Sequence, residues 1–87
     1  MINKKDLAKL TLFDAQELTE SIKPKDWKGN LILPKYTAET NVEGVPVQIV
    51  ISKGALEVKY KEDGRKKVYH YNCVFADLVY DRIKRSN

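Results

Sequence analysis

Few side chains in this sequence could perform chemistry on their own. The 87 residues include one histidine, His70, and one cysteine, Cys73, beside 12 aspartates and glutamates. A typical metal site built from soft ligands needs two or more His or Cys side chains, and a disulfide needs a second cysteine. We therefore expect no metal and no cofactor, and we expect a reducing, cytoplasmic compartment.

The sequence predicts one acid–base pair, Glu57 with His70. A turn at Asp63-Gly64 would place these two side chains opposite each other on neighbouring strands. Proton transfer alone does not make an enzyme, and the sequence places no nucleophile or second acid beside the pair. We interpret the pair as a cross-strand contact and Cys73 as a small core residue, and we expect no enzymatic activity.

The remaining candidates are cations, which favour binding over reaction. Lys and Arg number 16 against 12 Asp and Glu, so the net charge is +4. Lys59, Lys61 and Lys66 alternate along two predicted strands and should share one sheet face. That face could contact a protein or the phosphates of a nucleic acid, or it could simply keep the hairpin from aggregating. The partner-binding residues that we expect are Lys35, Gln48, Lys59, Lys61, Arg65, Lys66 and His70.

Helix signals dominate residues 1–22. Asn3 with Asp6, and Thr11 with the acid three places later, have the spacing of capping boxes. Apolar residues then recur at helical spacing until Pro24, which should end the helix near Ile22. We expect Trp27, in the polar connector that follows, to fold back onto the core.

The pattern of residues 31–72 predicts a four-stranded antiparallel meander. Turns centred on Val42-Glu43, Lys53-Gly54 and Asp63-Gly64 bring apolar residues together on one face. The predicted pairs are Ala38 with Val47, Tyr36 with Ile49, Ile49 with Val58, Val58 with Tyr69 and Leu56 with Tyr71. The same registers place Tyr36, Tyr60, Tyr69 and Tyr71 on the inner face, which disfavours nucleic-acid recognition by base stacking on the outer face.

Residues 73–85 predict a last helix, capped by Asn72. Its apolar stripe consists of Phe75, Leu78, Val79 and Ile83, with Val74 at the edge. We expect Ile49, Val58, Leu78 and Val79 to be buried between this stripe and the sheet. The fold class is therefore α+β, with residues 1–87 forming a single two-layer domain.

These features favour a small non-enzymatic binding protein that docks on a larger protein. Its size and the missing catalytic set are typical of compact inhibitors or adaptors encoded by phages and mobile elements. The alternative is a nucleic-acid-binding module that contacts phosphates through the basic hairpin. We expect no membrane association, since no stretch approaches the ~20 apolar residues of a membrane span. The sequence leaves monomer and homodimer both open.

Overall fold

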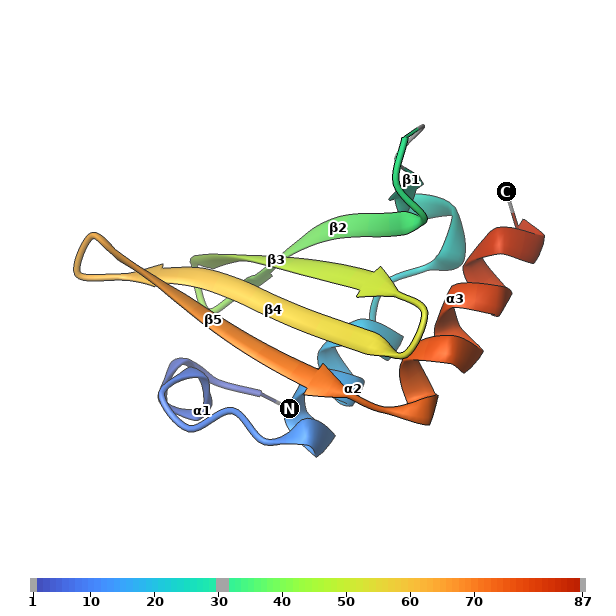
Figure 1. The fold of residues 1–87 in the computed structure, drawn as a ribbon. Helices are drawn as coiled ribbons and strands as arrows, with labels where there is room; N and C mark the ends of the chain where they lie inside the picture. The colour runs from blue at the N-terminus through green and yellow to red at the C-terminus, as the bar shows by residue number, and fades with distance from the viewer. Residues whose placement is uncertain (1, 30–31, 87) are drawn as a thin grey trace.

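The computed structural model describes residues 2–29 and 32–86, which form helices and one antiparallel sheet (Figure 1). Residue 31, where the predicted meander begins, lies outside these ranges. The chain order is α1 (Lys4–Leu7), α2 (Leu12–Glu20), the 3-10 turn η1 (Pro24–Asp26), β1 (Lys28–Gly29), β2 (Lys35–Val42), β3 (Val45–Ser52), β4 (Ala55–Glu62), β5 (Arg65–Asn72) and α3 (Val74–Ser86). The predicted α+β class is confirmed.

Both predicted capping boxes are present. The Thr11 hydroxyl accepts a hydrogen bond from the Asp14 amide, and the Asp14 carboxylate accepts one from the Thr11 amide, each at 3.2 Å. Asn3 and Asp6 make the same reciprocal pair at the start of α1. Helix α2 ends at Glu20, two residues earlier than expected, and Pro24 opens η1.

The described residues form five strands in the order β1-β2-β3-β4-β5, so the predicted count of four was wrong. The additional strand is β1, whose Lys28 and Gly29 pair with Thr37 and Tyr36. It lies in a polar connector without alternating apolar residues, and main-chain pairing alone makes it a strand. Trp27, which directly precedes β1, is buried in the core as expected.

The β2–β3 register also differs from the prediction. The turn is centred on Glu43-Gly44, and Ala38 therefore faces Ile49 instead of Val47. Both turn residues have positive φ, 48° and 88°. Glycine tolerates that conformation and β-branched Val42 does not, so Val42 stays in the strand. Moving the turn by one residue shifts each partner by two, so the assignment of residues to the two faces is unchanged.

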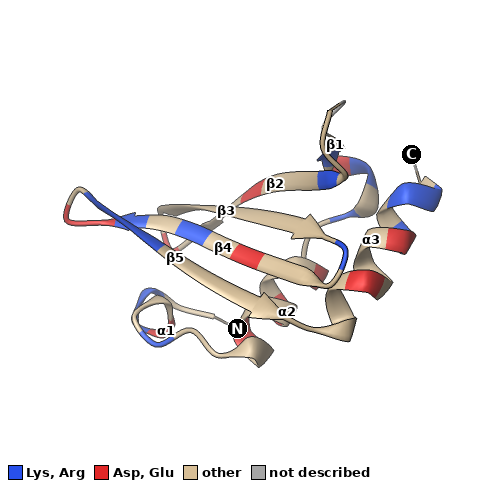
Figure 2. Ribbon diagram, in the orientation of Figure 1, with Lys and Arg blue, Asp and Glu red and all other residues tan. Residues whose placement is uncertain are grey.

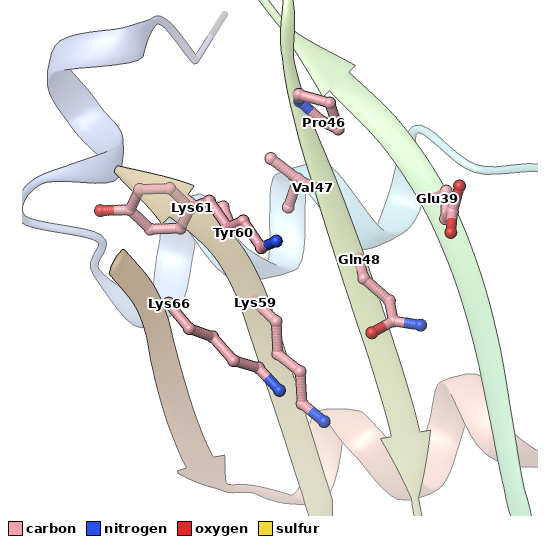
Figure 3. A pocket seen from close by; sticks show the side chains of 8 residues that line it. All are labelled: Glu39, Pro46, Val47, Gln48, Lys59, Tyr60, Lys61 and Lys66. Carbon is pink, nitrogen blue, oxygen red and sulfur yellow. The ribbon is translucent and has the colours of Figure 1, made fainter. Parts of the chain in front are cut away.

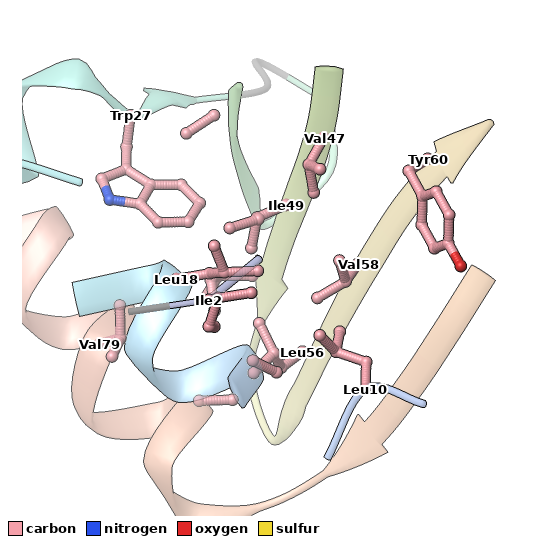
Figure 4. Packing of buried hydrophobic residues seen from close by; sticks show 14 of the residues in the cluster. Ile2, Leu10, Leu18, Trp27, Val47, Ile49, Leu56, Val58, Tyr60 and Val79 are labelled. Atoms are coloured by element: carbon pink, nitrogen blue, oxygen red, sulfur yellow. The ribbon is translucent and has the colours of Figure 1, made fainter. Parts of the chain in front are cut away.

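The other two hairpins have the predicted registers. Ile49 faces Val58, and Val58 faces Tyr69, along one continuous inner face. This face packs against the helices to form the core, and the labelled side chains of sheet and helices meet there in Figure 4. Ile49, Val58 and Val79 are buried, as predicted.

Helix α3 buries a different arc from the predicted stripe. The buried residues are Ala76, Val79, Tyr80 and Ile83, whereas Leu78 is 59% exposed. Ala76 is small enough for the helix to approach the sheet, and the Tyr80 ring packs edge-on against that of Tyr36 at 5.2 Å. The predicted burial of Leu78 was therefore wrong. The expected Asn72 cap was wrong as well, because Asn72 is a strand residue opposite Ala55.

Tyrosine hydroxyls on the inner face hold the N-terminal segment against the sheet. Tyr60 and Tyr69 both donate to the carbonyl oxygen of Leu7, at 2.7 and 2.8 Å, and Tyr71 donates to that of Leu10. Burial, followed by the hydrogen bond to Tyr69 and the charge of that neighbour, raises the pKa of Tyr60 to about 12. Burial likewise raises the pKa of Tyr71. These rings are committed to the core.

Candidate docking surface on the outer face of the sheet

The helices cover one face of the sheet and leave the other without a helical layer (Figure 1). Side chains alternate along each strand, so the residues between the core positions form this outer face. One cross-strand row contains Thr37, Val50, Glu57 and His70, and the next contains Glu39, Gln48, Lys59 and Val68. The outer face is therefore mostly polar.

Positive charge gathers where β4 and β5 approach their shared turn. Lys61 and Lys66 are direct cross-strand partners on the outer face, and Lys59 lies two residues before Lys61 on the same side. Figure 2 shows these basic segments together, with acidic residues in the turn itself. The turn residue Asp63 has φ 52° and Gly64 has φ 77°, which is the backbone that a tight two-residue hairpin requires. The hairpin therefore fixes the lysines at one end of the sheet.

This end of the outer face contains a hollow of about 400 Å³ (Figure 3). We call it the outer-face hollow. The outer-face residues that line it are Glu39, Pro46, Gln48, Lys59, Lys61 and Lys66, while Val47 and Tyr60 complete its floor. Three amino groups thus border the hollow against one carboxylate, so the site attracts negative charge and offers the Gln48 amide as a hydrogen-bonding group.

Only some of the predicted partner-binding residues line this hollow. Gln48, Lys59, Lys61 and Lys66 do, and the two-residue shift of β2 brings Glu39 opposite Gln48. Lys35, Arg65 and His70 lie outside it. Lys35 pairs with Ser52 at the far end of the sheet, and Arg65 closes the turn opposite Glu62.

Two of the outer-face residues that line the hollow were not among the predicted site residues. Glu39 and Pro46 alternate with core positions on the outer face, and that alternation is the signal that could have identified them.

Glu57 and His70 are cross-strand partners, as the turn predicted. The distance from the His70 Nδ1 to the Glu57 Oε1 is 3.8 Å, and the His70 Nε2 lies 3.2 Å from the Asn72 Oδ1. The imidazole is half exposed and is held between two polar neighbours along the sheet. This geometry matches an ordinary cross-strand contact at the surface.

Comparison with protein families, with curated proteins and with solved structures found no match to this chain. Within residues 2–29 and 32–86, no helix is both long and apolar enough to cross a membrane. The same residues contain no group of three His, Cys, Asp or Glu side chains placed to hold a metal ion.

Proposed function

We propose that this chain is a small non-enzymatic binding protein that docks on a larger protein through the outer face of its sheet. The observation that carries the proposal is the outer-face hollow, where Lys59, Lys61 and Lys66 line one side of a concave part of the sheet and Gln48 lines the other. At protein interfaces, anchor side chains of one partner commonly fill pockets on the surface of the other. The lysines favour an acidic patch on the partner, and a compact inhibitor or adaptor of phage or mobile-element type would work in this way.

The chemistry of the outer face favours a protein over a nucleic acid. Recognition of single strands commonly uses exposed aromatic rings, on which bases stack. Here the sheet tyrosines face the core, and three of them donate hydrogen bonds to the N-terminal segment. The outer face carries amides, carboxylates and lysines, a mixture that suits the rim of a protein interface.

Phosphate contact is the second candidate, and the same lysines support it. Lys61 and Lys66 are paired across the β4–β5 hairpin, so two amino groups could contact successive phosphates of a nucleic-acid backbone. Such binding would weaken steeply with added salt because it depends on counterion release.

The test compares two triple charge reversals in pull-downs from lysate, with and without nuclease. One variant combines Lys59→Glu, Lys61→Glu and Lys66→Glu. Its matched control combines Lys9→Glu, Lys25→Glu and Lys84→Glu, three exposed residues outside the hollow with the same change in net charge. We expect a nuclease-resistant partner that the first variant loses and the control retains.

Two other results would contradict the proposal. Capture that disappears after nuclease treatment, together with a gel shift that persists in moderate salt, would favour the nucleic-acid alternative. Capture that survives the outer-face triple change would show that the partner binds elsewhere. For a protein partner, charge reversal at the hollow should act mainly by slowing association, because these lysines remain solvent-accessible and steer the encounter.

A further inference from the structure

Strand β5 forms a free edge of the sheet beside the outer-face hollow. It is the last strand in the sheet order (Figure 1), and all eight of its residues pair in continuous register with β4. The opposite margin ends in β1, which has only two residues. An extended edge presents backbone amides and carbonyls that can pair with another strand.

The hairpin register determines which backbone groups point away from the sheet. Residues that flank a two-residue turn exchange hydrogen bonds, and bonded and non-bonded pairs then alternate along an antiparallel ladder. Arg65 and its partner Glu62 therefore form a hydrogen-bonded pair. Eight residues later the Cys73 amide donates to the Gly54 carbonyl at 3.0 Å, as the same alternation requires. The amides and carbonyls of Lys66, Val68 and His70 consequently face outward.

The outward groups are accessible, and no strand of residues 2–29 or 32–86 pairs with them. Lys66, Val68 and His70 are all exposed, with Val68 at 49%. The N-terminal segment lies under the inner face, where Leu7 accepts hydrogen bonds from the tyrosines, and in the described parts of the chain it provides no backbone partner for this edge. The edge contains no proline and no bulge in its register.

Charge is the remaining feature that restricts what can pair with this edge. Arg65, Lys66 and Lys67 follow one another in β5, and Lys61 lies beside Lys66 on the outer face. Basic residues on an edge repel a second basic strand. They attract a strand that carries carboxylates, since neighbouring strands lie about 4.8 Å apart and alternate side chains of an added strand would lie beside the lysines.

We infer that β5 binds an extended acidic segment of the partner as a sixth strand of the sheet. This inference rests on the proposed function and specifies the partner's element: its backbone pairs with Lys66, Val68 and His70, and its carboxylates face Lys66 and the hollow. Main-chain hydrogen bonds would supply affinity, and the lysines would supply the preference for acidic side chains.

The test uses a blocked eight-residue peptide of alternating glutamate and valine, with an alternating lysine and valine peptide as its charge control. The decisive variant is Val68→Pro, which removes one outward amide and leaves every hydrogen bond to β4 in place. Val68→Thr is its matched control, because threonine keeps both the amide and the branched side chain. The dissociation constant for the acidic peptide is measured by calorimetric titration. We expect Val68→Pro to raise it at least about tenfold and Val68→Thr to change it by less than about twofold.

A second probe keeps the protein unchanged, in case proline disturbs the fold. The acidic peptide with methyl groups on alternate backbone nitrogens, along the edge that would face β5, retains its charge but cannot donate to the sheet. We expect it to lose binding to the unmodified chain, and we expect the lysine peptide not to bind.

Several results would overturn the inference. Equal binding of the methylated and unmethylated peptides would show that charge alone holds the ligand, and no binding of the acidic peptide would exclude this occupant. Self-association in sedimentation that Val68→Pro abolishes would show that β5 pairs with a second copy. If an RNA oligonucleotide displaces the lysate partner and the acidic peptide does not, the surface would be assigned to nucleic acid. In every case except competition by RNA, the proposed function would still stand if capture of the lysate partner is lost in the triple variant of Lys59, Lys61 and Lys66.

Discussion

Two substitutions that each remove three carbons should have very different costs in unfolding free energy in this protein. Ile49 is fully buried at the centre of the inner face, whereas Leu78 is 59% exposed on α3. Burial of a methylene contributes about 0.8 kcal/mol, so Ile49→Ala loses about 2.4 kcal/mol of transfer free energy. The cavity left behind adds to this loss, and we expect about 3 to 4 kcal/mol in total.

For Leu78→Ala, only the buried part of the side chain contributes to the loss of transfer free energy. With 59% of the residue exposed, the loss scales to about 1 kcal/mol and leaves no enclosed cavity. Urea unfolding, followed by the fluorescence of buried Trp27, measures both variants in one assay. With a slope of about 1 kcal/mol per molar urea, the two midpoints should differ by about 2 to 3 M. A loss for Leu78→Ala as large as that for Ile49→Ala would refute the orientation of α3. If Ile49→Ala does not fold, Ile49→Val should still lose about 1 kcal/mol.

Two further predictions concern the tyrosine contacts and the β2–β3 turn. The folded state raises the pKa of Tyr60 from 10.0 to about 12, so its contribution to stability is complete below pH 10 and is lost as the pH rises towards 12. Urea unfolding at pH 8, 10 and 11 measures the free energy of unfolding, which should fall less steeply with pH for Tyr60→Phe than for the parent. Parallel falls in the two proteins would contradict the raised pKa of Tyr60. Gly44→Ala should lower the free energy of unfolding by about 1 kcal/mol, because alanine is strained at a φ of 88°. The loss should not be larger, because an added Cβ meets no atom within 4 Å. Lys53→Ala, at a turn position without positive φ, should cost less, and equal thermal midpoints for the two variants would argue against the turn geometry.

Local patterns in the sequence were sufficient for most of the sheet. Asp63-Gly64 and Lys53-Gly54 each combine a turn signal with apolar residues at period two on both sides, and both registers were confirmed. The predicted Val42-Glu43 turn was wrong because a turn centred there and one centred on Glu43-Gly44 assign the same residues to each face of the sheet. Periodicity cannot distinguish registers that differ by two residues, and only the conformational preference of Gly44 for positive φ separates them.

The capping boxes were also predictable, because each depends on side chains and amides within four residues of one another. The side of α3 that faces the sheet was not predictable from the sequence. Its sequence offers apolar residues on more than one side, and close packing of Ala76 and Tyr80 against the sheet determines which side is buried. Leu78 then becomes a surface residue, although its spacing is that of a core position.

The sequence by itself determined which residues alternate to the outer face, and it therefore placed Gln48, Lys59, Lys61 and Lys66 together. Alternation along a strand and a tight turn are local properties, so they can be recognised without a structure. The tertiary structure decided which of the predicted cations share a hollow and which do not. The predicted meander already placed the last strand at an edge, but only the tertiary structure shows that no described segment other than β4 pairs with β5, because such pairing depends on where distant parts of the chain pack.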